Sequence, residues 1–163
     1  MKILIIRHGI AAQQSTKSAD ESRRLTRIGR QKMKKAAHGL RTLVDEIDLI
    51  ATSPLARATQ TADILGAVYH GTRIVQIAAL SPGRPPAVLL EWLNAHPPTA
   101  TVALVGHEPH LSTFLCWLMT GLQESFVELK KGGVALVEIN GPATAGRAKL
   151  LWLMRPGQLR KLA

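Results

Sequence analysis

The sequence has a single cysteine, few aromatic residues and no apolar run that approaches the roughly 20 residues of a membrane helix. Cys116 alone cannot form an internal disulfide, and its position in the apolar run 114–119 predicts a buried, unreactive side chain. Aromatic residues make up 4%, which leaves little material for base-stacking surfaces. The apolar run at 1–6 is too short for a signal peptide. We therefore expect a cytoplasmic protein that binds no membrane and no specific nucleic acid.

Acidic residues are also scarce. Lys and Arg number 21 against 11 Asp and Glu, a formal charge of +10, and much of the excess lies in residues 23–35 and 149–161. This charge predicts attraction to nucleic acid, acidic protein surfaces or phosphorylated substrates, and it equally fits a solvated basic face that only keeps the protein in solution. At 163 residues with 46% hydrophobic residues, the chain fits a single globular domain over 1–163, with a monomer favoured.

The hydrophobic pattern predicts alternating strands and helices. Strands are expected at 2–6, 48–52, 71–75 and 101–105, and helices at 27–43, 54–69, 87–95 and 109–120. Thr26 and Ser53 are expected to cap the first two helices, with Pro54 as the first residue of the second. Two further strands, at 134–139 and 149–153, are expected to form a hairpin through 140–147. The fold class is therefore α/β, a three-layer α/β/α arrangement whose mainly parallel sheet has a mixed edge.

Polar residues follow three of the predicted strands. The first strand runs into Arg7, His8 and Gly9, the second into 53–57 with Arg57, and the fourth into His107. Ligands of open α/β sheets bind beyond the carboxyl ends of the strands. The sequence therefore predicts that two histidines and two arginines meet at one end of the sheet.

These residue types suit phosphoryl transfer. Arginine holds phosphate oxygens through a planar, permanently charged fork, and a neutral imidazole is a competent nucleophile near neutral pH. Gly9 lets the backbone approach the phosphate, and the helix starting at Pro109 directs N–H groups to the same place. Alone, a histidine at a strand end is more often structural, and Arg57 fits a surface charge. The prediction of a phosphate site depends on the four residues together.

Four segments resemble motifs of the histidine phosphatase superfamily, which includes the phosphoglycerate mutases. They lie at 4–9, 25–30, 53–62 and 105–109, in the family's order and spacing. The short chain and the ending at 152–159 resemble the SixA type, small bacterial phosphatases that act on phosphohistidine in signalling proteins. The resemblance implies a phosphoglycerate mutase-like fold without a cofactor. It also implies His8 as the nucleophile, with Arg7, Arg57 and His107 clamping the phosphate.

The sequence departs from many members of the superfamily in one respect. They carry a Glu or Asp after the third strand that protonates the leaving oxygen, whereas residues 79–84 here contain no carboxylate, as in SixA-type proteins. A phosphorylated imidazole leaves easily without such help, so the missing acid favours a P–N substrate. Asp20, Glu21 and Glu108 remain as alternative proton donors, although a solvated loop charge and a helix-dipole contact are their simpler interpretations.

Two alternatives to a phosphohistidine phosphatase remain open. One is a general phosphomonoesterase or mutase that acts on small phosphorylated metabolites, and the other is a non-catalytic polyanion-binding module. The His107 and His110 spacing occurs in metal sites, but no third ligand lies near in sequence, so we expect no metal. The expected partner is a phosphorylated protein or a small phosphorylated substrate.

Overall fold

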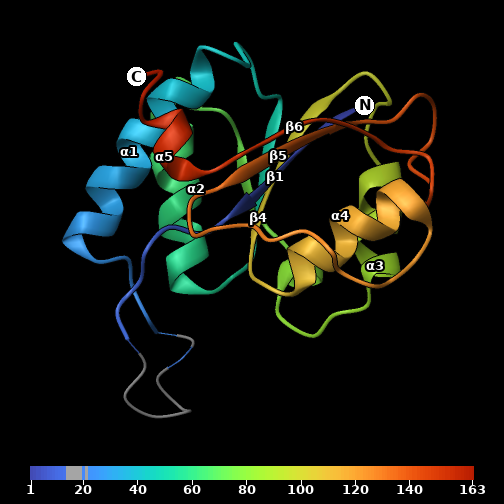
Figure 1. Cartoon of the computed structure of the whole chain (residues 1–163), viewed down its shortest axis with the longest axis horizontal. Coiled ribbons are helices and arrows are strands. Elements are labelled where there is room, and N and C mark those ends of the chain that lie inside the picture. The colour runs from blue at the N-terminus through green and yellow to red at the C-terminus, as the bar shows by residue number, and fades with distance from the viewer. Residues whose placement is uncertain (14–19, 21) are drawn as a thin grey trace.

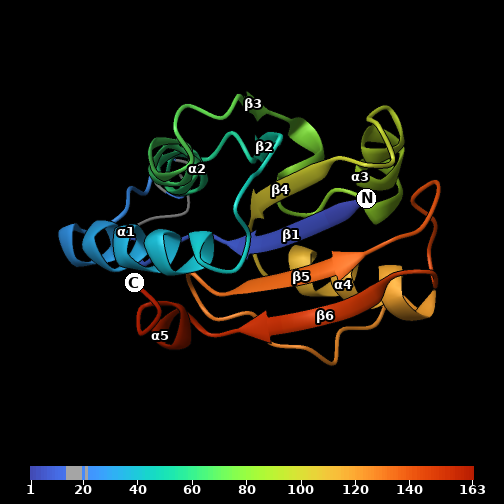
Figure 2. The same cartoon turned by 90° about the horizontal axis from the view of Figure 1, so that it is seen from above.

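A computed structural model describes residues 1–13, 20 and 22–163 of the chain. The described residues form a six-stranded sheet in the order β3-β2-β4-β1-β5-β6, with helices on both faces (Figures 1 and 2). The elements are β1 (Lys2–Arg7), α1 (Arg27–Arg41), β2 (Leu49–Thr52), α2 (Ala56–Val68), β3 (Ile74–Gln76), the 3₁₀ turn η2 (Ala78–Leu80), α3 (Pro86–Asn94), β4 (Thr101–Gly106), α4 (His110–Thr120), β5 (Val134–Glu138), β6 (Lys149–Met154) and α5 (Pro156–Leu159).

The strand pairing confirms the predicted mixed sheet. β1, β2, β3 and β4 are parallel, as expected for strands joined by helical crossovers. β5 pairs antiparallel with β1, and β6 pairs antiparallel with β5, so the last two strands form the predicted hairpin. The fold is the α/β type expected from the sequence.

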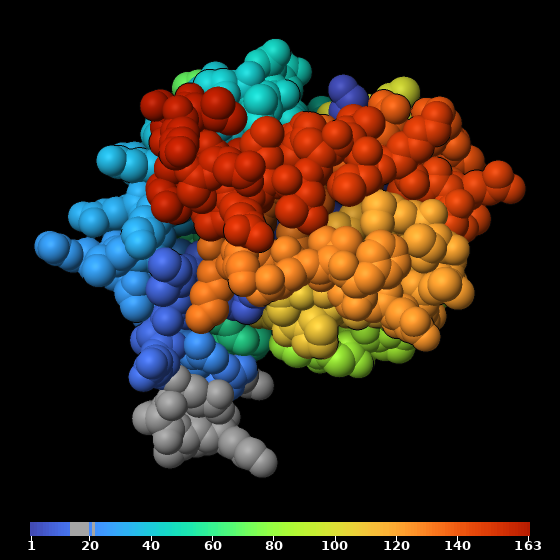
Figure 3. Space-filling model, in the orientation of Figure 1, coloured from blue at the N-terminus to red at the C-terminus, as the bar shows by residue number. Residues whose placement is uncertain are grey.

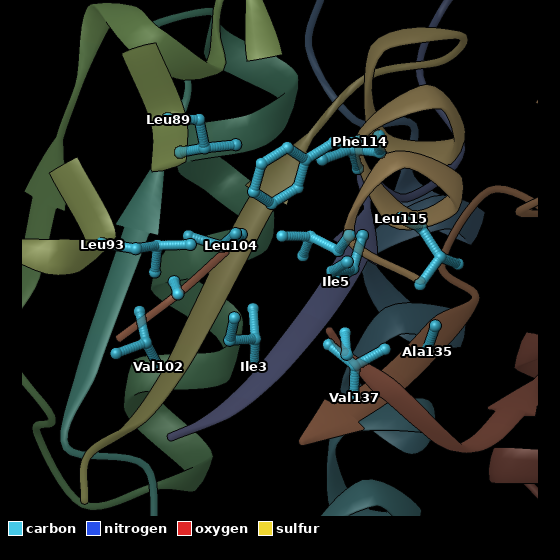
Figure 4. Packing of buried hydrophobic residues seen from close by; sticks show 14 of the residues in the cluster. Ile3, Ile5, Leu89, Leu93, Val102, Leu104, Phe114, Leu115, Ala135 and Val137 are labelled. Atoms are coloured by element: carbon cyan, nitrogen blue, oxygen red, sulfur yellow. The ribbon is translucent and has the colours of Figure 1, made fainter. Parts of the chain in front are cut away.

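Alternate residues of the central strand β1 supply two separate cores. Ile3 and Ile5 pack with α3 and α4 on one face, as Figure 4 shows. Leu4 and Ile6 pack on the other face against α1, α2 and α5. All four are fully buried, which explains the uninterrupted apolar run of a strand covered on both faces. Cys116 of α4 is buried as predicted. None of the helices formed by described residues is long and apolar enough to span a membrane.

Helix α1 begins as predicted but ends earlier. The Thr26 side chain accepts the Gly29 N–H at 2.9 Å and caps the helix. The helix ends at Arg41, because the Thr42 hydroxyl donates to the Gly39 carbonyl and the chain turns away. Two apolar side chains of the predicted helix do not join the core, since Ile28 is 56% and Leu43 39% exposed. The buried residues of the helix are Gly29, Met33, Ala36, Ala37, Gly39 and Leu40.

Two further predicted boundaries were wrong. Helix α2 begins at Ala56 with Leu55 at the N-cap, so Ser53 and Pro54 are not its cap and first residue. Strand β3 begins at Ile74, later than predicted, because His70 and Gly71 adopt positive φ angles of 55° and 85° in the turn after α2. The short helix α5, which the sequence pattern did not reveal, packs beside α1 (Figure 2).

Candidate active site

The predicted meeting of the strand ends is present in the structure. β1 and β2 lie on either side of β4 and run parallel to it, with Arg7 opposite Gly106 and Thr52 opposite Val105. The hydrogen-bond ladder continues one residue beyond the strands, since the His8 N–H donates to the Gly106 carbonyl at 3.1 Å. The residues that follow β1, β2 and β4 therefore share one end of the sheet.

His8 is 6% exposed and has a defined tautomer. Its Nδ1 lies 2.7 Å from the Gly9 carbonyl oxygen, which can only accept, so Nδ1 carries the proton and Nε2 keeps its lone pair. The pKa of His8 is lowered to about 4, mainly by burial, with help from the charges of Arg57, Arg7 and Lys131 and against the opposing effect of the Gly9 hydrogen bond. His8 is thus a neutral imidazole with a free Nε2 at neutral pH.

His107 lies opposite, with its ring centroid 5.2 Å from that of His8. Its Nε2 is 2.8 Å from the Ser53 hydroxyl, which itself accepts the Leu55 N–H at 3.3 Å. Because the Ser53 oxygen accepts from Leu55, its hydroxyl proton is available for Nε2 of His107. When Ser53 donates to Nε2, the proton of the neutral His107 ring lies on Nδ1. Burial and the charge of Arg57 lower the pKa of His107 to about 3. His107 is therefore neutral as well, with Nδ1–H as a free donor.

Two arginines approach the histidines from different elements. Arg57, in the first turn of α2, is 5% exposed and donates to the backbone carbonyl and the carboxylate of Asp20, at 2.7 and 3.1 Å. Arg7, at the end of β1, donates to the Leu129 carbonyl at 2.7 Å. Both guanidinium groups are thereby fixed in direction, while their Nε atoms remain buried without a partner among the described residues.

Gly9 joins the end of β1 to α2. Its N–H donates to the Thr61 hydroxyl at 3.1 Å, and that hydroxyl donates to the Arg57 carbonyl at 2.7 Å. A Cβ at Gly9 would lie 3.3 Å from the Leu25 side chain, so a larger residue would press on the neighbouring loop. The Thr61 side chain of α2 therefore positions both the segment that carries His8 and the helix turn that carries Arg57.

The pKa values of two carboxyl groups near the site are shifted in opposite directions. The hydrogen bond from Arg23 keeps the pKa of Asp20 below its usual value, helped by the charge of Arg57 and opposed by burial, so Asp20 is ionised at neutral pH. Burial raises the pKa of Glu108, which directly follows His107, although Ser112 and Arg7 oppose the shift. Glu21 lies outside the described residues.

Sequence reasoning placed His8, Arg7, Gly9, Arg57 and His107 but missed their supports. Ser53 and Thr61 lie in the segment 53–62 that resembles a family motif, and this position could have marked them as supports of the site. The prediction of Ser53 as a helix cap gave its hydroxyl another role, and Thr61 was given none. The Asp20–Arg57 ion pair joins residues 37 apart and has no sequence signal. Among the described residues, no three His, Cys, Asp or Glu side chains lie close enough to hold a metal ion.

The arrangement brings a neutral imidazole with a free Nε2 together with a set of unpaired donors. Buried Nε of Arg7, Nε of Arg57 and Nδ1 of His107 lack partners among the described residues, and each can donate to an anion. Buried donors without acceptors are rare in folded proteins and call for an explanation. A tetrahedral oxyanion next to His8 Nε2 would supply the acceptors. A cavity of about 560 Å³ around Trp92 and His96 lies at the other end of the sheet, and Arg7, Arg57 and His107 are not among the residues that line it.

Known proteins resemble this chain in sequence and in fold. Residues 3–81 match the histidine phosphatase superfamily (branch 1). An uncharacterized protein of Picosynechococcus sp. (strain ATCC 27264 / PCC 7002 / PR-6) is 35% identical over 136 residues, which cover 82% of each chain. The protein histidine phosphatase SixA, solved with tungstate, superposes with a TM-score of 0.85 at 25% identity, over 98% of this chain and 99% of that one.

Other solved structures share the fold at lower identity. A putative SixA from Agrobacterium tumefaciens superposes with a TM-score of 0.77 at 23% identity, over 95% of this chain and 97% of that one. A phosphoserine phosphatase from Entamoeba histolytica gives a TM-score of 0.69 at 18% identity, over 93% and 95%. With its family match, its relative at 35% identity and its SixA-like fold, the chain belongs to the histidine phosphatase superfamily.

Proposed function

We propose that the protein is a metal-independent phosphatase that transfers a phosphoryl group to His8 and then releases it to water. One observation carries the proposal: a free imidazole Nε2 lies beside three buried, unpaired donors from Arg7, Arg57 and His107. The cationic side chains of the chain itself provide the charge that a transferring phosphoryl group requires, so no metal is needed to supply it.

In the first step, Nε2 of His8 attacks phosphorus while the bond from phosphorus to the leaving group breaks. The two arginines and Nδ1–H of His107 hold the equatorial oxygens, where negative charge is spread. In the second step, water attacks the phosphohistidine, the P–N bond to His8 breaks, and inorganic phosphate leaves. The Gly9 carbonyl keeps the proton of His8 on Nδ1 throughout, so Nε2 is free again after each cycle.

We further propose phosphohistidine in a protein as the substrate. The imidazole ring of a phosphohistidine can already carry a proton near neutral pH, so its departure needs less help from a general acid than that of an alkoxide. Asp20 is ionised at neutral pH and occupied by Arg57 and Arg23, which makes it a poor proton donor. No carboxylate occurs between residues 79 and 84. The similarity to the protein histidine phosphatase SixA supports the same substrate class.

A second candidate function is hydrolysis of small phosphate esters. It is favoured by Glu108, which directly follows His107 and whose pKa is raised by burial, a shift that favours the protonated form of the carboxyl. Its Oε1 is buried and has no partner among the described residues. A protonated carboxyl there would serve an alkoxide leaving group as the missing acid.

The deciding experiment measures phosphate release, with EDTA present, from a phosphohistidine peptide and from the matching phosphoserine peptide. We expect the rate of phosphate release to be about 10² or more higher for the phosphohistidine peptide, because an ester would lack the general acid that its leaving group needs. His8→Asn should reduce turnover by about 10³ or more. His96→Ala, at the opposite end of the sheet, is the matched control and should leave the rate unchanged.

Trapping of the intermediate tests the nucleophile directly. Rapid quenching should give a phosphoenzyme that is stable to alkali, labile to acid and located on His8 by mass spectrometry. Preference for the phosphoserine peptide that disappears in Glu108→Gln would instead establish the second function. Full activity of His8→Asn, or inhibition by EDTA, would refute the mechanism.

A further inference from the structure

A separate cavity lies beside the segment that carries His8, on the α1 side of the sheet. It has a volume of about 170 Å³, and Gly9 belongs to its lining and directly follows His8. Three cationic side chains line it: Lys32 from α1, Lys131 from the turn before β5, and Arg160 just after α5. No acidic residue lines it.

The backbone around this cavity brings three distant segments together. The Gly132 N–H donates to the carbonyls of both Arg7 and His8, at 3.0 and 3.1 Å, so the turn with Lys131 is fixed to the end of β1. Gly39 lets α1 meet α5, because a Cβ there would lie 1.8 Å from the Leu159 carbonyl oxygen. The cations are thus attached to a packed framework and not to a freely moving loop.

The charges of the cavity are not balanced within the protein. The ion pairs formed by the described residues join Asp20 to Arg23 and Arg57, and Glu128 to Lys130, and they include none of the three cavity cations. Like charges held together repel one another unless an anion lies between them. An anionic group from a binding partner would offset this repulsion and be attracted to the cavity.

Helix α1, which contributes Lys32 to the cavity, presents a wider basic surface. Helix α1 carries Arg27, Arg30, Lys32, Lys34, Lys35 and Arg41 and no Asp or Glu. The C-terminal segment, with Arg155 and Lys161, adjoins α1 on the face shown in Figure 3. Helix α1 has no Phe, Trp or Tyr on which nucleic-acid bases could stack. The charge and composition of this surface favour an acidic protein over a single-stranded nucleic acid.

We propose that the cavity of Lys32, Lys131 and Arg160 receives an acidic side chain of the phosphorylated protein partner while its phosphohistidine enters the catalytic pocket. Its volume is below the roughly 300–1,000 Å³ of pockets for free small ligands, and it suits one carboxylate-bearing side chain. The inference rests on the proposed function, because it assigns a partner to the same catalytic site. It makes the enzyme selective for phosphohistidines that lie in acidic surroundings.

The test compares two phosphohistidine peptides of equal length, one with Glu and one with Gln around the phosphohistidine. We expect the wild type to have a kcat/KM about tenfold or more higher for the Glu peptide, through a lower KM, as for charge-assisted hydrogen bonds. Lys32→Glu with Arg160→Glu should abolish or invert this preference. The matched control, Arg147→Glu with Lys149→Glu at the far end of β6, changes the net charge equally and should keep it.

Turnover of phosphoramidate, which reaches only the catalytic pocket, separates this inference from the proposed function. The Lys32/Arg160 variant should hydrolyse it within about twofold of wild type, since neither side chain is among those proposed to attack or hold the phosphate, which are His8, Arg7, Arg57 and His107. If the wild type hydrolyses no P–N compound, the proposed function fails. Fluorescence anisotropy with the unphosphorylated Glu peptide then still tests the cavity. The inference requires weaker binding by the Lys32/Arg160 variant than by the wild type, and unchanged binding by the matched control.

Three results would overturn the inference. The first is an equal rate for the Glu and Gln peptides with wild type. The second is an equal loss in the cavity variant and its matched control, which would mean that only net charge matters. The third is tighter binding of a single-stranded oligonucleotide than of a Glu peptide of equal charge, which would assign the basic surface to nucleic acid.

Discussion

Two histidines of the same chemistry acquire opposite roles from one hydrogen bond each. The Gly9 carbonyl takes the Nδ1 proton of His8 and leaves Nε2 as a lone pair, whereas Ser53 binds Nε2 of His107 and leaves Nδ1 as a donor. With the rings 5.2 Å apart, the proposed mechanism has one side of the pocket attack phosphorus while the other holds its oxygens. The charge of Arg57 favours the neutral form of both rings, and Arg7 adds to this effect at His8.

The pKa of His8 predicts how the rate responds to pH. His8 acts when unprotonated, and its pKa is lowered from 6.5 to about 4, mainly by burial, so more than half of it stays active down to about pH 4. We therefore expect the acid limb of kcat/KM, which reports the free enzyme, to lie near pH 4 to 5. The assay uses phosphoramidate, corrected for its spontaneous hydrolysis. An acid limb near pH 6.5 would show a nucleophile with an unshifted pKa.

At the scale of helices and strands, the sequence predicted well what depends on local pattern. The buried strands carry near-continuous apolar runs, and their order along the chain fixes which carboxyl ends meet, so the site residues could be placed together. The start of α2 was predicted wrongly because the Ser53 hydroxyl, a common helix cap, bonds to His107 instead. Helix α5 could not be predicted, since its 4 residues are held by packing against α1 and not by their own helical pattern.

The contact between α1 and α5 depends on Gly39, and we predict that a larger residue there destabilises the fold. Gly39→Ala puts a Cβ 1.8 Å from the Leu159 carbonyl, a backbone atom, so α5 must move and Leu159 loses its burial. Alanine favours an α-helix by about 1 kcal/mol over glycine, but overpacking and lost burial cost more. We expect a net loss of about 1–3 kcal/mol in the free energy of unfolding, measured by urea denaturation.

Gly157→Ala is the matched control for this substitution. The nearest atom to its added Cβ is the end of the Arg160 side chain at 3.8 Å, which is an ordinary contact. This variant should be at least as stable as wild type. Equal stability of the Gly39 and Gly157 variants would mean that α5 contributes nothing to the fold.

For the whole molecule, the end of the sheet that supports the proposed chemistry lowers the stability of the fold. It concentrates buried cations and unpaired donors at one place, while the two apolar cores on either face of the sheet hold the strands in register. The excess charge of +10 acts in the same direction, and helix α1 itself carries no acidic residue to offset its basic side chains. An anion bound to the unpaired donors would offset their cost, so we expect phosphate binding to raise the stability of the fold.

The two active-site histidines make the stability of the whole fold dependent on pH. Burial lowers their pKa values from 6.5 to about 4 for His8 and about 3 for His107. Below pH 6.5 the unfolded chain binds protons at these sites and the folded chain does not, so stability falls as the pH falls. Between pH 7 and 5, above the range in which most carboxylates titrate, we expect a loss of about 2 kcal/mol for each histidine. Urea denaturation across this range measures the slope, and the His8→Asn, His107→Asn double variant should lose most of it. A slope that survives in the double variant would assign the acid sensitivity to other groups, starting with the buried His110, whose pKa burial also lowers.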